Sequence, residues 1–251
     1  MKKIFAILLC VALFASMLSL VSCDKDKDGK KYSETLNGKT PAELYEFSRE
    51  QLALAESYSV KTEQVIKMSY QGEKMTMHQS AETKVNGDDT YMVTENDFDD
   101  SLNMESWYVD GVCYSNMFGQ KVKSTISKSE YMEKYMEADP SESTLLDIPE
   151  SWFEDVKFET SGKSNVLEFE VSGEKFSNFL DNIGLGGATI DGNIDFKIYF
   201  DDDGNLTKVV MEFDMLMAGA EASCVSTSYV TIEDVKITPP SDASTYKEVD
   251  L

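Results

Sequence analysis

Histidine and arginine are almost absent from this sequence of 251 residues, which contains only His78 and Arg49 of these two types. Basic residues are also few, since 23 lysines and arginines face 46 aspartates and glutamates, for a net charge of −23. A chain this acidic repels phosphate backbones, so we expect no nucleic-acid partner. A Ser–His–Asp triad is possible only at His78. The 41% hydrophobic content is too high for a disordered acidic chain and predicts a sizeable core.

Motifs for catalysis or for cofactors are missing as well. The glycine-rich stretch 184–187 leads toward an expected strand instead of opening a helix, so it does not predict a phosphate site. The acidic runs at 97–100 and 201–203 lie beside turn residues and are typical of solvated loops. We therefore predict a protein that is not an enzyme and has no cofactor.

Two weak metal signals do not change that prediction. The pattern D-x-D-x-D-G over 24–29 begins like a calcium loop, but Thr35 occupies the twelfth position, where a glutamate is required. Methionine pairs, Met75 with Met77 and Met215 with Met217, could offer thioether ligands to Cu(I). The same i, i+2 spacing arises on one face of any strand, so core packing is the favoured interpretation and no metal site is assigned.

The N-terminus has the layout of a secretory signal, because two lysines precede an apolar run from Ile4 to Val21. This run ends in Leu20-Val21-Ser22-Cys23, which resembles the lipobox of bacterial lipoproteins. That resemblance implies a signal peptide over 1–22 and a lipidated Cys23, with a flexible tether over 23–40. We expect a cell-membrane protein that is anchored by lipid and faces outside the cytoplasm. An uncleaved membrane-spanning helix is the alternative.

Helix signals and strand signals alternate along the rest of the chain. Thr40-Pro41-Ala42-Glu43 starts a helix that we expect over 41–57. From Val60 the hydrophobic period is two, and Asn86-Gly87 and Asp110-Gly111 predict tight hairpin turns. A helical insertion capped by Ser129 and ended by Asp139-Pro140 follows. Later segments predict further strands and one short helix; their expected ranges are 156–160, 165–171, 189–200, 206–217 and 224–237 for the strands and 172–184 for the helix.

Because tight turns join consecutive strands, we predict an α+β fold with an antiparallel sheet. Three segments resemble the lipoprotein-localisation-factor superfamily, which includes mycobacterial surface lipoproteins that carry acylated lipids. They are Ser57-Tyr58-Ser59-Val60, the hairpin from Trp107 to Tyr114 followed by Lys121, and the last three strands. The resemblance implies a strongly curved sheet, or half-barrel, with helices on its concave face. It covers most of 41–237, so we expect one half-barrel domain over 41–251 with a polar C-terminal tail.

The same resemblance implies that the domain binds or carries a lipid or another apolar molecule. Our candidate ligand-binding residues are a stripe on the helical insertion and three sheet residues: Tyr131, Met132, Tyr135 and Met136 with Met68, Trp107 and Met215. The insertion would act as a lid over the cavity, or else its stripe is ordinary core. An alternative for the whole protein is an interaction module of the envelope, with a filled core and a protein or glycan partner. In either case we expect a monomer.

Two cysteines besides Cys23 follow the signal, Cys113 and Cys224. Both are expected in strands outside the cytoplasm, where a disulfide can persist. A bridge needs Cα atoms about 4.4–6.8 Å apart. The sequence leaves open whether these thiols pair.

Overall fold

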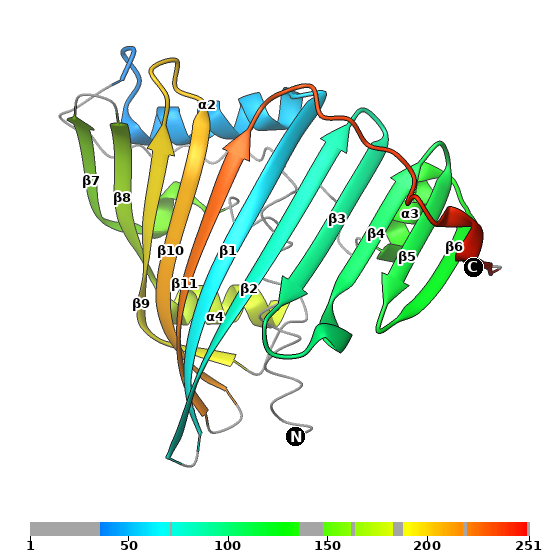
Figure 1. Cartoon of the computed structure of the whole chain (residues 1–251). Helices are drawn as coiled ribbons and strands as arrows, with labels where there is room; N and C mark the ends of the chain where they lie inside the picture. The colour runs from blue at the N-terminus through cyan, green and yellow to red at the C-terminus, as the bar shows by residue number, and fades with distance from the viewer. Residues whose placement is uncertain are drawn as a thin grey trace.

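A computed structural model of the chain describes residues 36–70, 72–135, 148–161, 164–182, 188–217 and 220–249. These residues form a twelve-stranded sheet in the order β12-β6-β5-β4-β3-β2-β1-β11-β10-β9-β8-β7 (Figure 1). The strands are β1 Ser57–Tyr70, β2 Glu73–Asn86, β3 Asp89–Asn96, β4 Met104–Val109, β5 Val112–Met117, β6 Gln120–Thr125, β7 Phe153–Ser161, β8 Ser164–Ser172, β9 Ala188–Phe200, β10 Leu206–Met217, β11 Ala220–Thr231 and β12 Lys247–Glu248.

The sheet consists of two meanders joined side by side. Strands β1 to β6 pair in chain order, and so do strands β7 to β11. The long strands β1 and β11 close the gap between the meanders through an antiparallel register from Ser59↔Thr231 to Ser69↔Glu221. The predicted antiparallel sheet is confirmed, apart from the short parallel pairing of β12 with β6.

The hairpin between β4 and β5 turns where the sequence predicts it. Val109 pairs with Val112, and the two residues between them both have positive φ, +51° at Asp110 and +77° at Gly111. Such a turn matches the right-handed twist of the flanking strands, and glycine adopts positive φ without strain.

Helix α2, Pro41–Leu54, begins at the predicted capping box. The Glu43 amide N–H donates to Thr40 Oγ1 over 3.3 Å, and the Thr40 amide N–H donates to Glu43 Oε2 over 2.9 Å. The expected helix extended to residue 57, but α2 ends at Leu54 because β1 begins at Ser57.

The cap predicted for the helical insertion is wrong by two residues. Helix α3, Lys128–Tyr135, is capped by Ser127, whose Oγ accepts from the Glu130 amide N–H while Glu130 Oε2 accepts from the Ser127 amide N–H. This reciprocal pair is a capping box that the sequence S-x-x-E already contains. The predicted helix end at Asp139-Pro140 lies outside the described residues. Helix α4, Gly173–Asn182, follows Ser172 as expected.

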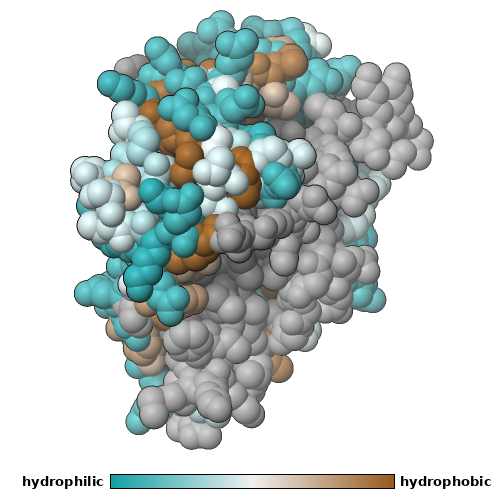
Figure 2. Space-filling model, turned by 90° about the vertical axis from the view of Figure 1, so that its right-hand side faces the viewer, coloured by the Kyte–Doolittle hydropathy of each residue, from teal (hydrophilic) through white to brown (hydrophobic). Residues whose placement is uncertain are grey.

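The last predicted strand is also corrected, since β11 ends at Thr231 and not at Ile237. The following segment leaves the sheet and crosses its upper end toward β6, drawn from orange to red in Figure 1. There Tyr246 is buried against Trp107, and the Lys121 ammonium pairs with the Asp242 carboxylate. The polar tail expected from the sequence is therefore packed on the sheet. Figure 2 shows this end of the molecule, where hydrophobic residues form small separate patches among hydrophilic ones.

Side chains on the long central strands alternate between two faces of the sheet. On β1 the residues Thr62, Gln64, Ile66 and Met68 are buried, whereas Lys61, Glu63 and Lys67 are exposed. We call the buried side the inner face and the other side the outer face. The described parts of all three helices contact the inner face: α2 through Tyr45 against Phe153, α3 through Tyr131 against Tyr108, and α4 against β8 and β9. The α+β architecture is thus confirmed.

Candidate functional site

The inner face contains five rows of residues that pair across neighbouring strands, and every side chain in these rows is uncharged. The rows follow the strand registers from β2 or β3 through β1 and β11 toward β7. They are Met75-Met68-Ala222-Met215-Ile190, Met77-Ile66-Cys224-Phe213, Asn96-Gln79-Gln64-Ser226-Met211-Phe196-Phe169, Thr94-Ala81-Thr62-Ser228-Val209-Ile198-Leu167-Phe158, and Met92-Thr83-Val60-Val230. Although the chain carries a net charge of −23, none of these residues is acidic or basic.

One side of the inner face, which we call the aromatic flank, lies on β7 to β10. The Phe169 ring stacks on Phe153 with centroids 3.8 Å apart and on Phe196 with centroids 5.0 Å apart. Tyr45 of α2 meets the same cluster edge-on, 5.4 Å from Phe153. Phe176 of α4 is fully buried in the same core. This flank is therefore filled by its own rings and by two helices.

The centre of the inner face, which we call the polar middle, lies on β11, β1 and β2. Thr62 Oγ1 and Ser228 Oγ share a hydrogen bond of 2.8 Å, and Gln64 Nε2 donates to Ser226 Oγ over 3.4 Å. The Gln64 side chain is 1% exposed, yet its Oε1 atom has no hydrogen-bond partner among the described residues. A buried amide oxygen without a partner costs about 1–3 kcal/mol, so this acceptor calls for an explanation.

The structure brings together only some of the predicted ligand-binding residues. Met68 and Met215 lie in the same inner row, separated by Ala222. Tyr131 is buried under α3, where its ring stacks on Tyr108 with centroids 4.7 Å apart. That stack lies at the β4 side of the inner face, away from the row of Met68 and Met215.

Trp107 lies on the opposite face from the other predicted sheet residues. Its ring contacts Tyr91, with centroids 5.4 Å apart, and Tyr246 of the C-terminal segment, with centroids 6.4 Å apart. Met132 and Tyr135 are on α3 with undescribed side chains, and Met136 and Cys23 lie outside the described residues.

Cys113 and Cys224 are both buried, and they are not joined by a disulfide. Cys113 on β5 and Cys224 on β11 are separated in the sheet by β4, β3, β2 and β1. Five strand spacings of about 4.8 Å place them far beyond the reach of a disulfide. Burial raises the pKa of the Cys224 thiol to about 12.

A groove of about 630 Å³ crosses the outer face at the far ends of β1, β2, β9, β10 and β11. Each strand contributes three consecutive residues. The side chains of Thr76, Lys67, Ser223, Asp214 and Asp191 form one wall, and those of Lys74, Ser69, Glu221, Leu216 and Thr189 form the other. The row of Met68 and Met215 lies between the walls, and because its side chains point to the inner face, its main chain forms the floor.

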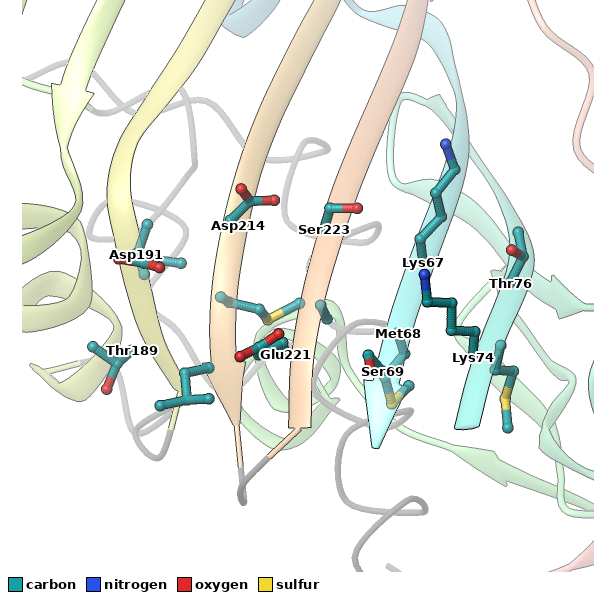
Figure 3. A pocket seen from close by; sticks show the side chains of 15 residues that line it. Lys67, Met68, Ser69, Lys74, Thr76, Thr189, Asp191, Asp214, Glu221 and Ser223 are labelled. Carbon is teal, nitrogen blue, oxygen red and sulfur yellow. The ribbon is translucent and has the colours of Figure 1, made fainter. Parts of the chain in front are cut away.

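Figure 3 shows how charge is distributed along this groove. Lys67 and Lys74 stand at its β1–β2 end, whereas Asp191 and Asp214 stand at its β9–β10 end, with Ser223 between the two groups. Among the described residues, none of these four charged side chains forms an ion pair. This site cannot be found from the sequence, because its residues come from five strands and no local motif connects them.

Groups suited to catalysis do not gather in the described part of the chain. His78 is exposed on the outer face of β2, and its amide N–H donates to Asp97 Oδ1 over 2.9 Å. Among the described residues, no group of three or more His, Cys, Asp or Glu side chains could hold a metal ion. Met77 and Met215 are part of the hydrophobic core. Of the helices that the structure describes, none has the length and apolar character to span a bilayer.

Comparisons with known proteins give one family match and several distant structural similarities. The model of DUF6612, a family of unknown function, matches residues 40–243. No curated protein matches the sequence significantly. Among solved structures, the Mycobacterium tuberculosis lipoprotein LppX is similar at 12% identity and a TM-score of 0.43, over 79% of this chain and 100% of that one. LprF from Mycobacterium bovis is similar at 10% identity and a TM-score of 0.37, over 78% and 94%.

A putative outer membrane lipoprotein-sorting protein domain from Vibrio parahaemolyticus is also similar, at 13% identity and a TM-score of 0.26, over 75% and 92% of the two chains. Each of these similarities is distant.

Proposed function

Since the chain belongs to the DUF6612 family, which brings no assigned function, we propose from its own residues that it is an envelope lipoprotein that binds a lipid or similar apolar ligand. In this proposal the sheet is a half-barrel with the helices on its concave face. Cys23 carries the lipid anchor, residues 23–40 form the tether, and the domain of residues 41–251 holds the ligand as a monomer.

The observation that carries the proposal is the uncharged inner face. The protein is rich in charged residues, and its sheet carries charged side chains on the outer face, such as the ion pair of Lys197 with Glu168. Excluding charge from every inner row is what an apolar ligand requires, because an unpaired charge facing hydrocarbon costs several kcal/mol.

The polar middle is the part of this face that we assign to the ligand. The aromatic flank is filled by stacked rings, and Tyr131 occupies the side near β4. Between them lie Gln64, Thr62 and Ser226, whose amide and hydroxyl groups are neutral. A ligand with an apolar body and a neutral hydrogen-bond donor, such as a hydroxyl or amide N–H, would satisfy Gln64 Oε1. Met68 and Met215 would line the adjoining apolar end, where thioether side chains adapt to the shape of a guest.

Native mass spectrometry of the full chain, extracted from membranes in mild detergent, tests this function. We expect a co-purifying lipid that survives exchange into a second detergent and is lost on unfolding. The matched comparison is the Cys23→Ser variant, which should lack the covalent lipid and keep the non-covalent one. If no non-covalent lipid is bound in either form, the binding proposal is wrong and the interaction module with a filled core becomes the better account.

A further inference from the structure

A second ligand site, independent of the first, lies on the other face of the sheet. We propose that the outer-face groove binds a compact zwitterion, with an oxygen-rich anionic group at Lys67 and Lys74 and an ammonium group at Asp191 and Asp214. The shared chemistry is that of phosphorylethanolamine, either as a free solute or as the headgroup of a lipid.

The two lysines at one end of the groove form no ion pair among the described residues. In a chain with 46 acidic and 23 basic residues, a lysine on a sheet easily finds a carboxylate. On the same two strands Lys61 and Lys84 both contact Glu82, at 3.5 and 3.0 Å. Lys67 and Lys74 instead lie diagonally across the β1–β2 hairpin with no acidic partner among the described residues. Two adjacent ammonium groups that form no ion pair can attract an anion.

Two carboxylates lie next to each other at the opposite end of the groove. Asp214 and Asp191 are direct cross-strand neighbours on β10 and β9, and both are exposed. Like charges at directly opposed positions destabilise a sheet, and a cation placed between them removes that cost. Lys67 does not fill this role, because Ser223 on β11 separates it from Asp214 by two strand spacings, about 10 Å between the backbones.

Size and polarity suit a small polar molecule. The groove volume of about 630 Å³ is within the range of about 300–1,000 Å³ for small-molecule sites. The hydroxyl groups of Ser223 and Ser69 line the walls between the two charged ends, and Thr76 lies beside Lys67 at the β2 end (Figure 3). All three hydroxyl groups can donate to an anionic oxygen. Glu221 adds a third carboxylate beside Ser69, so an anion alone is disfavoured away from the lysines.

Calorimetric titration of the full chain in detergent micelles tests the site with three probes: phosphorylethanolamine, inorganic phosphate and ethanolamine. We expect phosphorylethanolamine to bind at least tenfold more tightly than either half-molecule, because only it satisfies both ends of the groove. The double variants Lys67→Gln with Lys74→Gln, and Asp191→Asn with Asp214→Asn, should each weaken its binding at least tenfold.

The matched control is Lys61→Gln with Lys84→Gln, which removes two lysines from the outer face of the same strands outside the groove. It should leave the affinity within twofold. Absence of saturable binding, equal binding of phosphate and phosphorylethanolamine, or equal weakening by the control pair would each overturn the proposal. All substituted side chains except Lys84 are exposed, and unchanged unfolding midpoints would show that the variants are folded.

The source of the zwitterion is identified by repeating the titration in lipid nanodiscs. If a lipid headgroup occupies the groove, phosphorylethanolamine should bind at least tenfold more weakly in discs that contain phosphatidylethanolamine than in discs of phosphatidylglycerol alone. Equal affinity in both discs would support the zwitterion site and assign it to a free solute. Because the groove faces away from the inner rows, these results do not depend on lipid binding there.

Discussion

The aromatic flank and the polar middle belong to one face of one sheet, yet they bury different kinds of side chain. On β8 and β9, Phe169 and Phe196 stack and leave no polar atom to satisfy. Along the same row, on β1 and β11, Gln64 and Ser226 bring buried polar atoms, of which Gln64 Oε1 has no partner in the described part of the chain. The flank therefore has the chemistry of a packed core, whereas the middle keeps a buried acceptor that our proposal assigns to a neutral ligand.

The largest effect should come from breaking the aromatic flank. Phe169→Ala removes the ring between Phe153 and Phe196, and buried Phe truncations cost about 3–5 kcal/mol. Urea unfolding monitored by circular dichroism measures it. Phe98→Ala is the control, because that ring is 47% exposed and its loss should cost under about 1 kcal/mol. A similar small loss for Phe169→Ala would show that the flank is not a packed core.

A smaller effect should follow from pushing α4 away from the flank. A Cβ atom at Gly173 would lie 2.3 Å from the Gly192 carbonyl oxygen, a backbone atom that cannot rotate aside. Gly173→Ala should therefore cost about 2–3 kcal/mol in the same unfolding assay. Glu174→Ala, at the exposed next position, serves as the control and should be close to neutral. Equal stability of the two variants would contradict the close packing of α4 on β9.

Alkaline pH should lower the free energy of unfolding through Cys224, which lies between the aromatic flank and the polar middle. Burial raises the pKa of Cys224 from 9.0 to about 12, so the folded thiol stays neutral while the unfolded thiol ionises above pH 9. The resulting stability is complete below pH 9 and is lost as pH rises toward 12, by about 2 kcal/mol at pH 10.5. Tyr58, whose pKa is raised to about 12 by burial, adds to the same trend above pH 10.

Unfolding free energies of the parent and of Cys224→Ala between pH 8 and 11 measure the share of this thiol. The variant should lose less stability over that range than the parent does. Identical pH dependence would mean that Cys224 ionises equally in both states and is not buried as described.

The smallest effect on stability should come from the polar middle itself. Gln64→Leu removes the unpartnered Oε1 at similar volume, so it should change stability by less than about 1 kcal/mol, in the stabilising direction. It should also shift binding from hydroxylated amphiphiles toward plain hydrocarbon probes, measured by competition with a fluorescent fatty acid. Gln79→Leu, at the facing position of β2, has no orphaned atom to remove and should destabilise instead. A large stability loss for Gln64→Leu would show that its amide oxygen is satisfied.

Most strands and turns of the sheet could be predicted from the sequence, but the side-chain contacts on its inner face could not. Local signals are sufficient for the turn at Asp110-Gly111 and for the capping box of α2, since each involves residues within a few positions. The contact of Gln64 with Ser226 depends instead on the β1–β11 register, across 162 residues of sequence. The period of two places Thr62 and Gln64 on the same face as Ile66, but no local pattern shows which side chains they meet across the sheet.

The residues of the two candidate ligand sites could not be predicted from the sequence for a related reason. Trp107 was grouped with Met68 and Met215 by hydrophobicity, but β4 turns its ring to the outer face, against Tyr91. Alternation assigns Trp107 and Tyr108 to opposite faces, but it does not say which face the helices cover. The placement of Lys67 and Asp214 in one groove likewise depends on the order β1-β11-β10, which no local spacing reveals.

Photo-crosslinking with a diazirine-labelled fatty alcohol, followed by peptide mass mapping, tests the central claim most directly. The probe has an apolar body and a neutral hydroxyl, and its crosslinks report which residues lie beside it. We predict crosslinks on inner-face residues of β1, β2 and β11, around Gln64, Gln79 and Ser226. They should disappear with excess unlabelled alcohol. Crosslinks confined to outer-face residues, or insensitive to competition, would contradict a ligand site on the polar middle.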